Sequence, residues 1–174
     1  MNKFKISQIQ FQALPTPCEN TELLEKLFKK SIKYKPDLIC TPECSNIITN
    51  DVKYLFKHST LQKECQILNM AKKFAKKNRV HINIGSLLLK VNNNKKLVNR
   101  SILINKFGKI QAYYDKIHLF DVNISSNENH RESKSFNKGG KLVLTKINGI
   151  KIGFSICYDL RFPDMYRKHA KKGA

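Results

Sequence analysis

The alternation of helix-period and strand-period segments in the first half of the chain most constrains its fold. Apolar side chains recur at helical spacing over residues 21–34 and again over residues 61–78. Each of these segments leads into an apolar run, at residues 37–40 and 80–89, and an earlier run covers residues 4–9. Helices that alternate with strands bury their apolar faces on a shared sheet. The pattern therefore predicts α/β layers with a mixed sheet.

The second half of the chain has strand patterning with one long interruption. Strands are predicted at residues 98–105, 110–114, 142–147 and 150–156, and a turn at residues 92–94. Asn148-Gly149 joins the last two runs, and Asn-Gly between alternating runs is a strong hairpin signal. Pro163 is placed to open a helix over residues 164–172. Residues 119–140 show no periodicity, which in a compact domain usually marks a functional or disordered segment.

The composition fits one packed domain. Of the 174 residues, 41% are apolar and 26% are charged, which is too apolar for a disordered chain. No apolar run is long enough for a transmembrane helix, and the opening MNKFKISQIQF lacks the long apolar segment of a secretory signal. The five cysteines are odd in number and irregularly spaced, unlike a disulfide framework. We therefore expect a cytoplasmic protein with no membrane partner.

The chain is strongly basic, with 33 Lys and Arg against 13 Asp and Glu and a net charge of +20. A charge of this size suggests a nucleic acid or an anionic membrane as a partner. The lysines, however, are scattered from Lys3 to Lys172 and are not clustered with aromatic residues. This scatter favours solvated faces, so we expect no nucleic-acid partner and keep a basic nucleic-acid-binding module as an alternative.

Three polar residues stand where predicted apolar strands end. Cys157 comes at a strand-to-helix turn, where a nucleophile is exposed and backbone N–H groups can face an oxyanion. Glu43 comes at a sheet edge, where α/β ligand sites lie, and could exchange a proton with a thiol. Lys116 could favour a thiolate or stabilise an oxyanion. Taken singly, each has a simpler reading: a buried structural cysteine, an exposed loop glutamate and one more surface lysine.

Other candidate sites have less support. Cys40 and Cys44 are four residues apart, but no second Cys or His pair follows at zinc-finger spacing, so we expect no metal site. His118 precedes an apolar pair, which favours a core or hydrogen-bonded histidine over a catalytic base. We expect an ion pair between Asp159 and Arg161 to shape the nucleophile turn. The phosphate-binding glycine motifs are absent from the sequence.

Three segments taken together resemble the nitrilase superfamily of carbon–nitrogen hydrolases. They are TPE at 41–43, YYDKIHLFD at 113–121 and ICYDLRFPDMYR at 156–167, in that family's order of Glu, Lys and Cys. The resemblance runs along the whole chain. With RES at 131–133 it is closest to the Nit-type amidases, which act on deaminated glutathione or on ω-amides of 2-oxo acids.

The resemblance implies an α-β-β-α sandwich and an amide hydrolase site without metal or cofactor. Carried over by position, Cys157 would be the nucleophile, Glu43 the general base and Lys116 the cation that stabilises the oxyanion. Glu132 matches a second glutamate that orients the lysine and the attacking water in many members. The backbone N–H of Tyr158 would complete the oxyanion site.

The resemblance also sets expectations for the protein as a whole. Members usually continue well beyond the nucleophile turn, so we expect residues 1–174 to be the N-terminal part of a single carbon–nitrogen hydrolase domain, with the sandwich incomplete at its C-terminus. The expected reaction is cleavage of a small carboxylate-bearing amide through a Cys thioester, with release of ammonia. The expected partners are that small molecule and, at full length, further copies of the chain. A nitrile hydrolase, an N-carbamoyl hydrolase and an inactive fragment remain as alternatives.

Overall fold

The computed structural model describes residues 3–92, 95–123 and 129–174. The helices are α1 (Pro17–Ser31), α2 (Val52–His58), α3 (Gln66–Asn78) and α4 (Pro163–Lys171), with 3-10 turns at Ile32–Tyr34, Gln62–Glu64, Glu132–Lys134 and Cys157–Arg161. The strands are β1 (Ile6–Gln8), β2 (Leu38–Cys40), β3 (His81–Lys90), β4 (Leu97–Ile104), β5 (Ile110–Asp115), β6 (Asp121–Asn123), β7 (Asn129–Arg131), β8 (Leu144–Ile147) and β9 (Ile150–Gly153).

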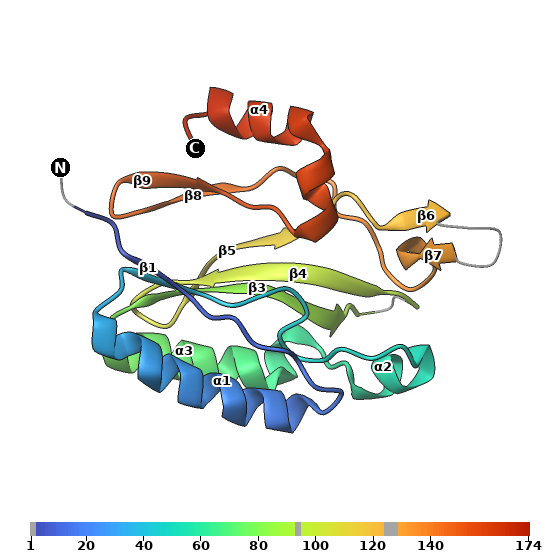
Figure 1. Ribbon diagram of the computed structural model, residues 1–174, viewed down its shortest axis with the longest axis horizontal. Helices are drawn as coiled ribbons and strands as arrows, with labels where there is room; N and C mark the ends of the chain where they lie inside the picture. The colour runs from blue at the N-terminus through green and yellow to red at the C-terminus, as the bar shows by residue number, and fades with distance from the viewer. Residues whose placement is uncertain (1–2, 93–94, 124–128) are drawn as a thin grey trace.

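These elements stack in four layers (Figure 1). Helices α1 and α3 lie under a five-stranded sheet of order β1-β2-β3-β4-β5. The hairpin β8–β9 lies over the other face of that sheet, and α4 lies outside the hairpin. The order helix, sheet, sheet, helix confirms the predicted α-β-β-α sandwich.

The five-stranded sheet is mixed, as the alternation of elements predicts. Strands β1, β2 and β3 are parallel neighbours, because α1 carries the chain from β1 to β2 and α3 carries it on to β3. The next two neighbouring pairs, β3 with β4 and β4 with β5, are antiparallel. The residues that end β2 and β5 are followed directly by the segments that hold Glu43 and Lys116.

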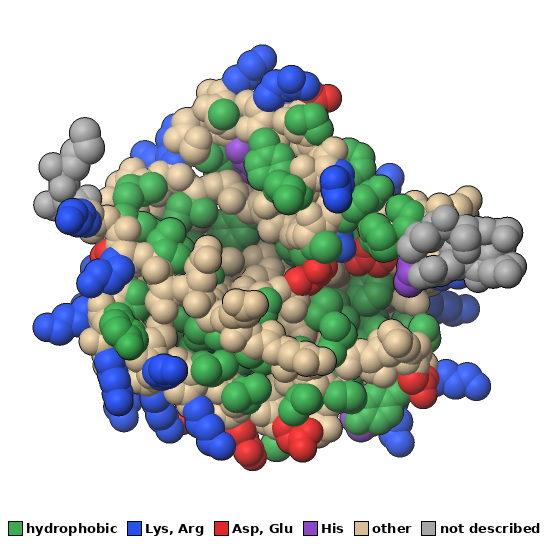
Figure 2. All heavy atoms as spheres, in the orientation of Figure 1, with side chains coloured by type: hydrophobic (Ala, Val, Ile, Leu, Met, Phe, Trp, Pro, Cys, Tyr) green, Lys and Arg blue, Asp and Glu red, His purple; other side chains and the backbone are tan. Residues whose placement is uncertain are grey.

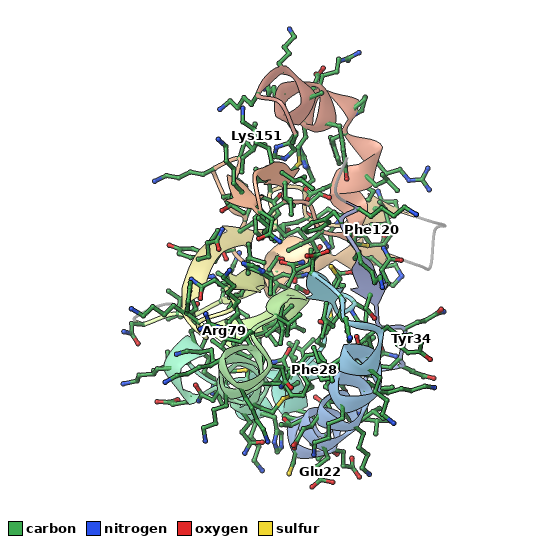
Figure 3. All side chains as sticks on the ribbon, turned by 90° about the vertical axis from the view of Figure 1, so that its left-hand side faces the viewer. Glu22, Phe28, Tyr34, Arg79, Phe120 and Lys151 are labelled. Carbon is green, nitrogen blue, oxygen red and sulfur yellow. The ribbon has the colours of Figure 1, made fainter. Side chains whose placement is uncertain are left out.

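The core has a separate cluster on each face of the five-stranded sheet. On the helix side, Leu24 and Phe28 of α1 pack with Ala71 and Ala75 of α3 against the sheet. Figure 3 shows Phe28 in the lower half of the molecule, where it belongs to this cluster. On the other side, Tyr114 is fully buried in a cluster that includes side chains of the β8–β9 layer and of α4. This second cluster packs the β8–β9 hairpin and α4 onto the five-stranded sheet.

The surface charge is distributed as the scattered lysines predict. Figure 2 shows lysine and arginine side chains around the outline of the molecule, while a group of acidic side chains lies in the hollow between the layers. None of the helices in the described part of the chain is long and apolar enough to cross a membrane.

Three local expectations need correction. Helix α1 begins at Pro17, before the predicted start, with proline at its favoured first position. Asn20 lies inside the helix, where it is buried and binds Leu14 and Asn46. Helix α2 is too short to give a clear helical period and was not predicted. The patternless residues 119–140 contain β6, β7 and a 3-10 turn. Of that segment, residues 124–128 lie outside the described residues, as do residues 93–94 of the predicted turn.

A bulge in β3 holds the loop that carries Glu43. The pairing of β3 with β4 shifts between Ile84 and Leu87. At this bulge Gly85 donates its N–H to Thr41 Oγ1 at 3.1 Å. A Cβ on Gly85 would lie 2.1 Å from the Thr41 carbonyl oxygen and 2.6 Å from that of Pro42. The close approach of the two backbones therefore requires glycine.

This contact predicts the effect of two glycine substitutions on stability. Gly85→Ala should lower the free energy of unfolding of the full-length protein by about 3 kcal/mol, because the new methyl group overlaps backbone that cannot move aside. Gly140→Ala is the control, since a Cβ there would meet nothing within 4 Å, and its effect should stay within about 0.5 kcal/mol. Urea unfolding measures both. Equal stabilities for the two variants would contradict this account of the bulge.

Candidate active site

The structure brings together the side chains of Glu43, Lys116, Glu132 and Cys157, although the sequence separates them widely. Lys116 Nζ lies 3.1 Å from Glu43 Oε1 and 3.1 Å from Glu132 Oε2. The Glu43 carboxylate also lies close enough to the Cys157 thiol to raise the pKa of that thiol. They lie at the ends of different elements, since Lys116 follows β5, Cys157 opens a 3-10 turn after β9, and Glu132 opens another after β7. The four side chains named from the sequence as site residues therefore lie at one place in the fold.

Lys116 is a buried cation between two carboxylates. The residue is only 2% exposed. Burial is the strongest single influence and disfavours the ammonium, but the charges and hydrogen bonds of Glu43 and Glu132 together outweigh it. The pKa of Lys116 is therefore raised, and the side chain is an ammonium at neutral pH.

Each carboxylate also accepts a hydrogen bond from an uncharged N–H group. Asn99 Nδ2 donates to Glu43 Oε1 at 2.8 Å. The backbone N–H of Phe120 donates to Glu132 Oε2 at 2.6 Å. Asn99 was not identified from the sequence. The available signal was weak, because Asn99 is one of three polar residues, with Arg100 and Ser101, between the apolar ends of β4.

Cys157 occupies a left-handed backbone conformation, with φ of 46°. Such a value is uncommon for a residue with a side chain and persists only where the surroundings enforce it. Ile156, directly before it, donates its N–H to Asp159 Oδ2 at 2.8 Å. This bond connects the residues on either side of Cys157 and so restrains the backbone of Cys157.

Asp159 links the nucleophile turn to the segment around Lys116. It is fully buried and accepts hydrogen bonds from the Tyr114 hydroxyl at 2.7 Å and from the His118 N–H at 3.1 Å. Its Oδ1 also lies 2.7 Å from His118 Nδ1, as expected for a hydrogen-bonded histidine. The predicted ion pair between Asp159 and Arg161 is wrong, because these inward bonds take up both oxygens of the carboxylate.

Aromatic side chains border the turn that carries Cys157. Tyr158 makes edge-to-face contacts with Phe120 and Phe162, at ring centroid distances of 5.0 and 5.4 Å. Phe162 in turn stacks on His118 at 3.6 Å. Figure 3 shows Phe120 in the upper half of the molecule, on the side of α4. These contacts fix the Tyr158 backbone, whose N–H lies in the first turn of the 3-10 helix, where such groups lack an intrahelical acceptor.

Two other cysteines near the site have thiols of strongly raised pKa. Burial raises the pKa of Cys40 to about 11. Burial, followed by the charge of Glu43, raises the pKa of Cys44 to about 12. Both are therefore neutral thiols at ordinary pH. Across residues 3–92, 95–123 and 129–174, no three His, Cys, Asp or Glu side chains are grouped so that they could hold a metal ion.

Comparison with known families identifies the chain. A family model described as carbon-nitrogen hydrolase matches residues 6–174. The chain belongs to the carbon-nitrogen hydrolase family.

Relatives of this carbon-nitrogen hydrolase include amidases. The deaminated glutathione amidase of Dictyostelium discoideum is 32% identical over 173 residues, which are 95% of this chain and 60% of that protein. Omega-amidase NIT2 of Xenopus tropicalis is 27% identical over 173 residues, which are 99% of this chain and 61% of that protein. The chain thus spans about three fifths of the length of these relatives.

Solved structures of the same fold include the NitFhit protein of C. elegans and an amidase from Nesterenkonia sp. AN1. The first superposes with a TM-score of 0.85 at 23% identity, over 97% of this chain and 41% of that one. The second has a TM-score of 0.83 at 19% identity, over 99% of this chain and 64% of that one. In this second structure acrylamide has added to the active site cysteine of that amidase. At these identities the likeness shows the fold.

The Cys157 thiol of this carbon-nitrogen hydrolase is held in its neutral form. Partial burial is the largest cause that raises its pKa, followed by the charge of Glu43 and the hydrogen bond to that carboxylate. Lys116 acts in the opposite direction and is outweighed. The thiol therefore keeps its proton at neutral pH, beside a carboxylate that could accept it.

This arrangement predicts that removing the Glu43 charge makes Cys157 more reactive toward an alkylating reagent. Glu43→Gln should increase the rate of iodoacetamide addition to Cys157 at pH 8 by about threefold. Loss of the carboxylate charge lowers the pKa of the thiol, so more thiolate is present, and the weaker nucleophilicity of that thiolate offsets part of the gain. Peptide mass spectrometry of the full-length protein measures the rate at this cysteine.

Glu132→Gln is the matched control, because Glu132 makes the smallest of the contributions that raise the pKa of Cys157. Its effect on the alkylation rate should be smaller than that of Glu43→Gln. A Glu43→Gln variant that reacts no faster than the parent would contradict the assigned electrostatics.

Proposed function

We propose that the protein is an amidase that cleaves the C–N bond of a small carboxylate-bearing amide through a thioester on Cys157. The observation that carries the proposal is the convergence of one thiol, one carboxylate and one buried ammonium at the same place. These are the groups that acyl transfer from an amide requires: a nucleophile, a base and a stabiliser of negative oxygen. The names of the relatives and the cysteine adduct of the Nesterenkonia amidase support the same reaction class.

In the first step the Cys157 proton moves to Glu43 while the sulfur forms a bond to the amide carbon. The carbonyl electron pair moves onto oxygen. Lys116 and the Tyr158 N–H then stabilise the oxyanion, in a site where burial strengthens such contacts. When the oxyanion collapses, the C–N bond breaks and the nitrogen takes the proton from Glu43. Ammonia leaves and a thioester remains on Cys157.

In the second step water attacks the thioester carbon and gives its proton to Glu43. Glu132 fits the role of orienting Lys116 and this water, since it contacts Lys116 Nζ through both carboxylate oxygens. Collapse of the second oxyanion releases the carboxylic acid, and the sulfur recovers its proton from Glu43. One difficult substitution is thus divided into two easier ones, and no cofactor is needed in either step.

Substitution of the nucleophile tests the mechanism. Cys157→Ala in the full-length protein should lower the rate of ammonia release from succinamate by about 10³-fold or more, because the covalent route is lost. Cys18→Ser is the control, since Cys18 is also exposed but lies on the distant helix α1, and it should keep the parent rate. Ammonia release near the parent rate in Cys157→Ala would rule the mechanism out.

A substrate panel tests the expected substrate class against the alternatives in the same family. We expect kcat/KM for succinamate to exceed that for propionamide by about tenfold, because the net charge of +20 attracts an anionic amide. Propionitrile and N-carbamoyl-β-alanine complete the panel, with ammonia release as the readout. Faster turnover of either compound than of succinamate would replace the amidase proposal with a nitrile or N-carbamoyl hydrolase.

A further inference from the structure

Asn99 places an amide against the base of the proposed mechanism. It lies on β4 opposite Leu88 of β3 and is only 2% exposed. Its Nδ2 donates to Glu43 Oε1 at 2.8 Å, and its backbone carbonyl accepts the N–H of Lys116 at 3.0 Å. One residue therefore fixes both the side chain of the base and the backbone of the cation beside it.

The orientation of the Asn99 amide follows from its neighbour. A carboxylate oxygen only accepts hydrogen bonds, so Nδ2 and not Oδ1 must face Glu43. Within the described part of the chain, Asn99 Oδ1 is then buried without a hydrogen-bond partner. A buried unpaired carbonyl is unfavourable and rare in folded proteins. The unpaired Oδ1 is present because Nδ2 of the same amide group binds Glu43.

The two hydrogen bonds at Glu43 meet on the same oxygen. Oε1 accepts both Asn99 Nδ2 at 2.8 Å and Lys116 Nζ at 3.1 Å. Together these two bonds occupy Oε1. We propose that Asn99 is a positioning residue that holds Oε1 of Glu43, so that Oε2 is the oxygen that exchanges the proton with Cys157. This inference rests on the proposed function.

The pH dependence of the reaction separates this role from a purely structural one. Asn99→Leu removes the donor and the unpaired carbonyl together in a side chain of similar size. The ionised form of Glu43 loses a hydrogen bond, so the acid limb of kcat/KM for succinamate should move to higher pH by about one unit. A residue that only supports the fold would lower the rate at every pH and leave the limb in place.

Asn99→Asp provides a second variant of almost unchanged shape. It places another carboxylate beside Glu43, and two adjacent carboxylates resist ionising together. The acid limb should therefore move further than in Asn99→Leu. Ser101→Ala is the matched control, because Ser101 is equally buried two residues along the same strand and bonds to Ile84 and Asn83, not to Glu43. Its acid limb should coincide with that of the parent.

A direct titration of the carboxylate distinguishes failure of this inference from failure of the proposed function. Carbon-13 NMR of protein labelled at the glutamate carboxyl carbon follows Glu43 without any substrate, with the Glu43→Gln spectrum as the assignment. The midpoint should rise by about one pH unit in Asn99→Leu. A raised midpoint in a protein that releases no ammonia would support the role of Asn99 and refute the amidase. Unchanged midpoints in both Asn99 variants would overturn the role of Asn99, whatever the activity.

Discussion

The candidate site depends on the Lys116 ammonium, which is buried between two carboxylates. An unpaired charge in this position would be strongly unfavourable, and the pair of glutamates makes it favourable. The converse also holds, because Glu43 and Glu132 would repel each other without the cation between them. The Lys116 ammonium thus holds three chain segments together: the loop after β2, the end of β5 and the 3-10 turn at Glu132–Lys134.

Two further constraints bring the segments close enough for that ion pair. The β3 bulge at Gly85 lets the Thr41–Pro42 backbone approach the sheet closely. This approach positions Glu43, the next residue in the chain. From the other side, Asp159 binds Tyr114 and joins the nucleophile turn to β5. Both constraints are contacts within the protein itself, so they hold the site in place without a substrate. Such preorganisation is the main source of electrostatic stabilisation in enzymes.

The sequence was sufficient to predict much of this arrangement. Cys157, Glu43 and Lys116 are polar residues at the ends of apolar strands, and strand ends meet at one edge of a sheet. The family motifs added Glu132, which lies in a segment without periodicity and has no such signal of its own. Their proximity in the structure agrees with these positions, while their roles in the reaction stay predictions.

What could not be predicted depends on contacts between distant segments. The inward bonds of Asp159 involve Tyr114, 45 residues earlier, and no local pattern distinguishes them from an ion pair with Arg161. Asparagine is a residue type that favours the N-cap of a helix, but the amide of Asn20 lies inside α1 and donates to the Asn46 carbonyl. Tertiary contacts therefore override the local preference. Asn99 is a similar case, because its partner Glu43 lies 56 residues away.

The departures from ordinary backbone and side-chain rules also concentrate at the site. Among the described residues, the non-glycine residues with positive φ are Lys35, Cys44, Arg79, Asn148 and Cys157. Lys35 and Arg79 end helices and Asn148 lies in a hairpin turn, where this conformation is expected. The other two are Cys44, next to Glu43, and Cys157 itself. With the unpaired Asn99 Oδ1, they place local strain around the base and the nucleophile, as expected where function rather than stability determines the geometry.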